Sequence, residues 1–268
     1  MHGGATAVTA GWLVAAWNSA AVHRTTILLC TLALWEAISR LGVVDPIFLP
    51  PPSTIVLAVT EIFDDPRAVA AFRVTGLELG LSFVIAAVLG LAIGIPLGLN
   101  RFLRDAFLPP ILFLLSTPKA IFLPIFLILF GIGVDSKIAY GAFSAFFYIV
   151  DNVVGGVGLL EAKRRRLARA FGAPLRHYLV DIVIPSALPG IFAGMWHGLR
   201  QALAAVLVAE LFASDSGVGY MVRIYTNQFR TDKTLALVAV VSLLVIVAGS
   251  LFNRLEVRMN RWRAVAHT

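Results

Sequence analysis

Long apolar runs alternate with short polar turns along almost the whole chain. A helix that crosses the hydrocarbon core of a membrane needs about 20 mainly apolar residues. We therefore predict an all-α polytopic membrane protein with about six transmembrane helices. The predicted spans cover residues 25–44, 74–99, 107–130, 138–154, 185–211 and 235–252. This pattern divides the chain into an N-terminal segment over 1–24, a transmembrane domain over 25–253 and a basic tail over 254–268.

Prolines interrupt this pattern at definite places. Pro50-Pro51-Pro52 cannot lie inside a helix, and the mixed stretch after it predicts a short interfacial helix over 53–65. We expect the fifth span to follow breaks at Pro185 and Pro189, and the third span to be broken as well. A broken helix survives in a bilayer only where protein or a water-filled cavity satisfies its backbone groups, so the third span is a candidate lining for a passage. Its prolines are Pro109, Pro110, Pro118 and Pro124.

Glycines mark two further stretches. Gly90, Gly94 and Gly98 recur every four residues in the second predicted span. This spacing predicts close packing against another helix, because small residues let two helix backbones approach. The polar stretch 214–233, which contains two closely spaced glycines, is expected to be a loop with a turn.

The composition supports the membrane prediction. Of the 268 residues, 59% are hydrophobic and 14% are charged, whereas a soluble domain is about half apolar and about a quarter charged. This excludes a soluble globular enzyme, a disordered chain and a nucleic-acid module. The single cysteine, Cys30, excludes an intrachain disulfide and a cysteine metal cluster. Arg24 is the first basic residue and follows the first apolar run, so we expect no cleaved signal peptide.

The net charge of +7 fits a basic bias on the cytoplasmic side. With the N-terminus inside, 13 of the Lys and Arg residues lie inside and 7 outside, which predicts that both termini are cytoplasmic. The longest inside loop, about 159–178, is amphipathic and strongly basic. It is either an interfacial helix on anionic lipid or a docking helix for a soluble partner. Its basic residues are Lys163, Arg164, Arg165, Arg166, Arg169 and Arg176.

A resemblance favours the docking interpretation. The run Arg166-Leu167-Ala168-Arg169-Ala170-Phe171-Gly172, followed by Ile182 and Pro185, resembles the EAA loop of ATP-binding-cassette importer permeases. Other short motifs between residues 25 and 263, in matching order and spacing, are similar to the nitrate/sulfonate/taurine branch of that family. They include Leu34-Trp35-Glu36, Phe130-Gly131-Ile132-Gly133, Pro185-Ser186-Ala187-Leu188-Pro189-Gly190, Ala209-Glu210-Leu211 and Ser216-Gly217-Val218-Gly219-Tyr220.

The resemblance implies the type I ABC importer permease (MetI-like) architecture, with a coupling helix that docks on an ATPase subunit. Arg166 and Leu167 stand where the family has Glu and Ala, so this docking surface is basic where the family's is usually acidic. The docking residues that the resemblance implies are Arg165, Arg166, Leu167, Ala168, Arg169, Ala170, Phe171 and Gly172.

The resemblance also implies partners, a location and a class of substrate. The partners are a second permease chain in a homodimer, two ABC ATPase subunits, an extracytoplasmic solute-binding protein and the lipid bilayer of the bacterial cytoplasmic (inner) membrane. The substrate is a small anion such as nitrate, sulfonate or taurine, or bicarbonate. The chain has no Gly-x-x-x-x-Gly-Lys-Ser/Thr motif, so it cannot hydrolyse ATP itself. We expect no catalytic residue, metal site, cofactor or nucleic acid on this chain, and ATP and Mg on the partner ATPase.

Three basic residues within the predicted spans are candidate pathway groups. Lys119 lies in the broken third span, and His197 and Arg200 share a face of the fifth. A charge at membrane depth is costly and usually faces a cavity or a partner, and fixed positive charges attract an anion. The alternative roles are structural: snorkelling or a helix-end cap for Lys119, and a buried pair with Glu210 or a neighbouring helix for the other two.

We therefore predict a permease subunit of an ATP-driven importer that works by alternating access. The alternative is an ion-coupled secondary transporter acting without an ATPase. Such transporters usually carry acidic relays inside their spans, whereas Glu36, Glu78 and Glu210 lie near predicted span ends or can pair. A membrane-embedded enzyme is disfavoured, because the chain contains neither His-Glu-x-x-His nor Gly-x-Ser-x-Gly.

Overall fold

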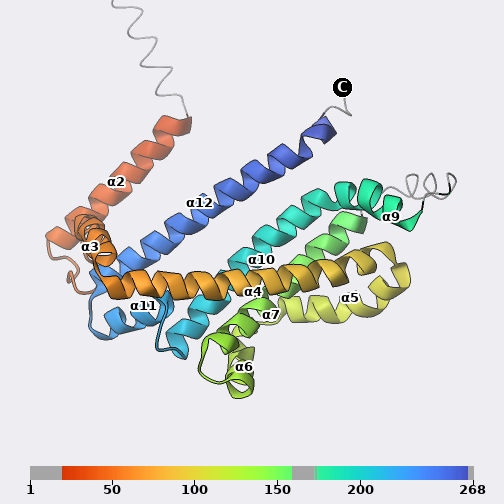
Figure 1. Ribbon diagram of the computed structural model, residues 1–268. Coiled ribbons are helices and arrows are strands. Elements are labelled where there is room, and N and C mark those ends of the chain that lie inside the picture. The colour runs from red at the N-terminus through yellow and green to blue at the C-terminus, as the bar shows by residue number, and fades with distance from the viewer. Residues whose placement is uncertain (1–19, 159–171, 173, 265–268) are drawn as a thin grey trace, which may run out of the picture.

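The computed structural model describes residues 20–158, 172 and 174–264, and within these ranges every regular element is a helix. The chain turns back on itself repeatedly, so that most helices lie side by side in one bundle (Figure 1). The elements are α2 (Ala20–Arg40), α3 (Pro52–Asp64), α4 (Pro66–Leu99), α5 (Arg101–Ser116), η1 (Lys119–Phe122), α6 (Leu123–Phe130), α7 (Val134–Gly158), α9 (Leu175–His177), η2 (Tyr178–Val183), α10 (Ile184–Phe212), α11 (Val218–Asn227) and α12 (Thr231–Ala264).

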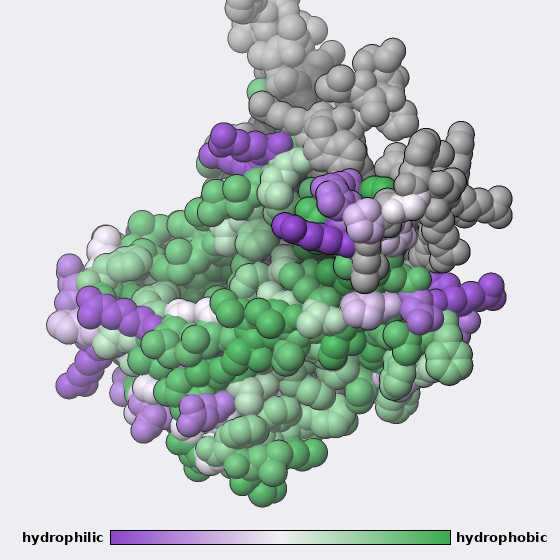
Figure 2. Space-filling view, turned by 45° about the vertical axis from the view of Figure 1, so that its right-hand side comes forward, coloured by the Kyte–Doolittle hydropathy of each residue, from purple (hydrophilic) through white to green (hydrophobic). Residues whose placement is uncertain are grey.

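Most of the predicted spans correspond to helices of membrane-crossing length and hydropathy. Four described helices qualify: α4, α7, the stretch Tyr178–Phe212 and residues Thr231–Met259 of α12. The bent pair α5 and α6 qualifies as a fifth when it is counted as one span. Helix α2 coincides with the first predicted span but is not in this set, so a sixth span stays a prediction. Figure 2 shows the apolar surface that results, with hydrophilic residues gathered at its margins.

The prolines break fewer helices than predicted. The third span bends by 95° between Ser116 and Lys119, at Pro118, whereas Pro109 and Pro110 lie inside α5. Pro124 lies in the first turn of α6, where a missing N–H removes no intrahelical hydrogen bond.

The predicted breaks at Pro185 and Pro189 are wrong. Pro185 occupies the first turn of α10 and Pro189 lies inside it, and the helical stretch runs on from Tyr178 to Phe212. The physical reason lies in the six π-helical residues of η2, which end at Val183, two residues before Pro185. Local π adjustments and neighbouring helices are the means by which membrane helices tolerate proline.

The polar stretch 214–233 is more ordered than the predicted loop. Helix α11 forms within it, and α12 already begins at Thr231. Val218, Met221 and Tyr225 of α11 are buried against α3, α4 and α12, so apolar burial stabilises a helix that its polar composition concealed. At its other end α12 continues to Ala264, so the predicted basic tail begins inside a helix. A helix was also predicted over 53–65, and α3 confirms it.

The core of the bundle is α7, which lies between α4 and α10. The glycine stripe packs here as predicted: a Cβ atom built on Gly90, Gly94 or Gly98 would lie within 3.0 Å of Ile149, Val153 or Val157 of α7. On the other side of α7, the Cα atoms of Gly156 and Gly190 face each other, and a Cβ on Gly190 would lie 2.6 Å from the Cα of Gly156. Glycines therefore bring the backbones of α7 and α10 into direct contact and let side chains of α7 pack onto the backbone of α4.

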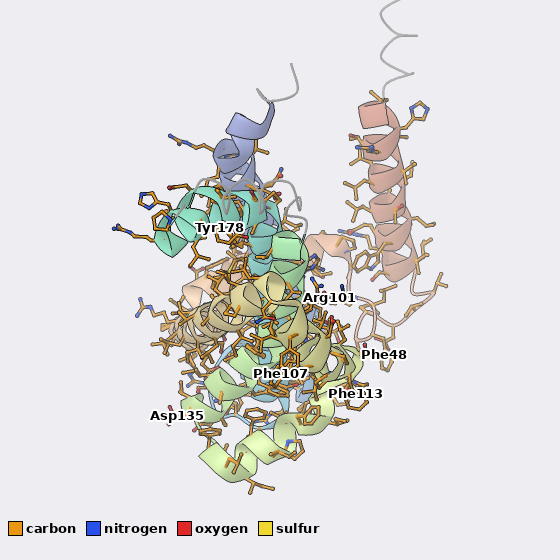
Figure 3. The ribbon with its side chains drawn as sticks, turned by 90° about the vertical axis from the view of Figure 1, so that its right-hand side faces the viewer. Phe48, Arg101, Phe107, Phe113, Asp135 and Tyr178 are labelled. Atoms are coloured by element: carbon orange, nitrogen blue, oxygen red, sulfur yellow. The ribbon has the colours of Figure 1, made fainter. Side chains whose placement is uncertain are left out.

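Helix α2 stands apart from the rest of the bundle (Figures 1 and 3). It is anchored at its C-terminal end, where the Ser39 hydroxyl donates to the Leu49 carbonyl and Glu36 accepts from Ser53. Glu36 also forms an ion pair with Arg40. The remainder of α2 leaves an apolar surface exposed, formed by Ile27, Leu28, Leu29, Leu32 and Leu34.

Candidate functional site: docking segment and span charges

The predicted docking residues Arg165–Phe171 lie outside the described residues. Gly172 is described: its φ is +61°, a left-handed conformation that glycine adopts without a steric penalty. It precedes α9, whose Arg176 and His177 are exposed. In Figure 1 this part of the chain lies at the end of the bundle opposite α3 and α11. Figure 3 labels Tyr178, which follows α9, and Asp135, which lies in the first turn of α7.

Lys119 lies at the bend between α5 and α6 and is buried, with 7% of its surface exposed. Its Nζ donates to the Leu115 carbonyl at 2.8 Å and lies 4.9 Å from the centre of the Tyr148 ring on α7. The Leu115 carbonyl lies in the last turn of α5, where carbonyl groups have no hydrogen-bond partner within the helix. The geometry therefore matches the helix-end cap that was the alternative role for Lys119.

Arg200 and His197 are exposed on α10. The Arg200 guanidinium lies 5.9 Å from the centre of the Trp196 ring. It borders a cavity of about 220 Å³ between α4, α10 and α12, whose other walls are apolar and include Leu203 and Leu244. The side chains of Lys119 and Arg200 thus face different neighbours. Lys119 faces α7, whereas Arg200 faces this cavity. Glu210 is bonded to Thr75 and to the backbone of Gly219.

Sequence reasoning missed a buried ion pair. Lys137 falls just before the predicted span 138–154, but it lies in the first turn of α7 with 1% of its side chain exposed. Its Nζ is 3.3 Å from Oε1 of Glu78 on α4, which is fully buried. The signal was present in the sequence, because Glu78 lies deep in an apolar run and a charge in such a place requires a partner. Among the described residues no group of three or more His, Cys, Asp or Glu could hold a metal ion.

The family is decided by comparison with known proteins. Residues 86–261 match the model of the binding-protein-dependent transport system inner membrane component. This chain belongs to that family. It is therefore an inner-membrane permease subunit of a binding-protein-dependent importer and not an enzyme, and the family implies ATPase and binding-protein partners. The comparisons support this function and not the secondary transporter.

Three relatives place the permease in the predicted branch. A permease protein named for aliphatic sulfonate transport, from Bacillus subtilis, is 32% identical over 87% of this chain and 84% of its own length. The taurine transport system permease protein of Escherichia coli is 28% identical over 92% of this chain and 93% of its own. The nitrate import permease protein of Synechococcus elongatus is 28% identical over 71% of each chain.

Proposed function

We propose that this permease imports a small anion and that Arg200 attracts that anion within the membrane. Arg200 lies about two thirds of the way along Tyr178–Phe212 and forms no ion pair among the described residues. An unpaired charge at this depth is costly, and an anion at the cavity would offset that cost. The relatives named for sulfonate and nitrate transport carry anions, which supports this class of substrate.

His197 and Lys119 add positive potential in this proposal. His197 is exposed on the same helix as Arg200, three residues before it. Lys119 is held at the bend of the broken span by the Leu115 carbonyl. Its ammonium contributes to the field inside the bundle without touching the anion, because a fixed charge acts over several ångströms in a medium of low dielectric constant.

The basic segment 159–178 is the surface for the ATPase partner, and ATP and Mg bind that partner. The support is its place in the fold: it joins the end of α7 to the start of the α10 span, the two helices whose backbones glycines bring into direct contact. A push on this segment therefore reaches the core directly. With both termini cytoplasmic, the segment lies inside and α3 and α11 lie outside.

Two copies of the chain form the passage. Within a single chain, most of the apolar surface of helix α2 is not covered by any other described helix. Helix α6 also exposes large apolar side chains, among them Ile128 and Leu129. A second copy related by two-fold symmetry would cover such surfaces, and this arrangement is the commonest in oligomers. Two ATPase subunits then dock below, and rigid-body rocking of the two bundles alternates access.

Uptake by a reconstituted complex tests the role of Arg200. The complex contains the permease, its ATPase and its binding protein, in vesicles loaded with ATP. Arg200→Gln and the double variant Arg200→Gln, Lys119→Gln should import the anion at least about tenfold more slowly, the effect of losing about 1.4 kcal/mol of attraction. Arg200→Lys keeps the charge and should retain most of the rate. Unchanged anion uptake in the double variant would contradict the proposal.

Co-purification tests the docking segment. The tagged permease should recover its ATPase subunit from mild detergent, and a variant with the basic residues of 163–172 made neutral should not. A matched variant with Arg254 and Arg258 of α12 made neutral should keep the ATPase, because those residues lie outside the segment. Equal recovery in all three would return segment 159–178 to the alternative role of a lipid-surface helix.

A further inference from the structure

The start of α11 is held by side chains of two spanning helices. The Thr75 hydroxyl of α4 donates to Oε1 of Glu210 at 2.6 Å and accepts from the backbone N–H of Val218 at 2.9 Å. Oε2 of Glu210, on α10, accepts from the N–H of Gly219 at 2.7 Å. The first N–H groups of a helix have no partner within it, and a negative charge is favoured at that end. Glu210 and Thr75 thus act as an N-cap supplied from the bundle.

Two glycines make this close approach possible. A Cβ atom on Gly219 would lie 2.5 Å from the Leu207 carbonyl and 2.7 Å from the Cβ of Glu210. A Cβ on Gly217 would collide with the Glu210 carboxylate, and the φ of Gly217 is +95°. The backbone of α11 therefore rests directly on α10 at the residue that caps it.

The cap is joined to the buried ion pair. Glu78 lies three residues after Thr75 on α4, so the two side chains share a face. The Glu78 and Glu210 carboxyl groups interact with each other, and Lys137 of α7 lies beside Glu78. Separating a buried charge from its partners costs several kcal/mol. The polar cluster of Thr75, Glu78, Lys137 and Glu210 thus resists displacement of α11 relative to α4, α7 and α10.

The face of α11 that lies away from α10 combines apolar side chains, among them Ile224, with polar and charged ones. Together with the start of α4 it forms a cleft of about 430 Å³, bordered by Asp65, Arg67, Asp215 and Tyr220. The Arg223 guanidinium lies 5.1 Å from the centre of the Tyr220 ring and donates to the Ser214 carbonyl at 2.6 Å. Charges of both signs beside an aromatic ring are typical of the polar rim and aromatic anchors of protein interfaces.

We infer that Thr75 and Glu210 are positioning residues that couple α11 to the spans, so that docking of the solute-binding protein on the α11 cleft moves α4, α7 and α10 as one body. This inference rests on the proposed function, which places α11 on the outer side. The outer docking surface is then formed by helix α11, and the polar cluster transmits the movement of α11 to the spanning helices.

The first measurement is the ratio of ATPase activity with and without the binding protein, in the reconstituted complex. Thr75→Val keeps the shape of the side chain and removes both hydrogen bonds. The ratio should fall about tenfold, toward the value without stimulation, because the variant loses the hydrogen bonds that tie Thr75 to Glu210 and to Val218. Thr75→Ser keeps the hydroxyl and should restore the ratio. Thr60→Val on α3 is the matched control, because its exposed hydroxyl bonds only within its own helix.

The second measurement is hydrogen exchange of the same complex without the binding protein. Thr75→Val and Glu210→Gln should both accelerate exchange at the start of α11 and leave α3 unchanged. A wild-type ratio in Thr75→Val, or unchanged exchange in α11, would overturn the inference. A wild-type complex that the binding protein does not stimulate at all is a different result, because it contradicts the proposed function itself.

Discussion

The contact between Gly98 and Val157 gives a prediction whose magnitude follows from the structure. A Cβ atom on Gly98 would lie 2.5 Å from the Cβ and 2.7 Å from the Cγ1 of Val157, and Val157 is fully buried. A rotamer change of Val157 would move Cγ1 but would leave its Cβ in place, so it cannot relieve the collision by itself. Overpacking of this kind costs about 1–3 kcal/mol.

The matched control lies on the same helix. Gly80 of α4 has no atom within 4 Å of its Cβ position. Gly80→Ala should therefore keep only the intrinsic gain of about 0.5–1 kcal/mol that alanine has over glycine in a helix. Gly98→Ala should be less stable than Gly80→Ala by about 1–3 kcal/mol, because the same gain is opposed by the collision.

The assay is the free energy of unfolding of the purified permease in mixed detergent micelles. A double-mutant cycle adds the decisive comparison. Val157→Ala alone loses about 1.5 kcal/mol of buried methyl groups. In the background of Gly98→Ala it removes the 2.7 Å contact with Cγ1, while the contact with the Cβ of residue 157 stays, so it relieves part of the collision. The double variant should thus lose less free energy of unfolding than the two single variants lose together, by about 0.5–3 kcal/mol. Equal stabilities of Gly98→Ala and Gly80→Ala would refute the reasoning that glycine sets the distance between α4 and α7.

Three further predictions concern charges and turns. Lys137→Met should lower the free energy of unfolding by about 3–5 kcal/mol, because it leaves Glu78 buried without its cation. Adding Glu78→Leu should recover most of this loss in the same assay. No recovery in the double variant would contradict the pairing. Gly172→Ala should weaken recovery of the ATPase subunit, because alanine at a φ of +61° costs about 1–2 kcal/mol; wild-type recovery would show that the turn is not needed for docking. Burial raises the pKa of the Tyr225 phenol on α11 above its ordinary value of 10.0. The unfolded chain therefore ionises first, and the stability associated with Tyr225 should be intact below pH 10 and fall as the pH rises beyond it; Tyr225→Phe should remove this part of the loss, as followed by unfolding at several alkaline pH values.

Much of the fold was predictable from apolar runs, because membrane-spanning helices satisfy their own backbone groups and leave a local record in the sequence. The failures were at Pro185, Pro189 and the stretch 214–233. A π-helical turn and neighbouring helices accommodate the two prolines, and burial of Val218 and Met221 stabilises α11. Each cause depends on segments far away in the chain, so no local pattern reveals it.

The candidate site divides in the same way. Lys119, His197 and Arg200 were recognisable as charges inside apolar runs, but their neighbours were not. The alternative pairing of Arg200 with Glu210 is not found among the described residues, since Glu210 caps α11. Lys137 was missed because a lysine at the end of an apolar run has the same local signature whether it faces water or a buried carboxylate.

The sequence by itself determined that this is a helical membrane protein, its family and the close packing of its glycine stripe, because hydropathy, motif spacing and a small-residue period are properties of the chain. Only the tertiary structure decided which helix the stripe contacts, which carboxylate Lys137 meets and that Glu210 of α10 holds the start of α11. The physical reason is that most of these interactions join residues dozens of positions apart, and their geometry exists only when α4, α7 and α10 are packed together.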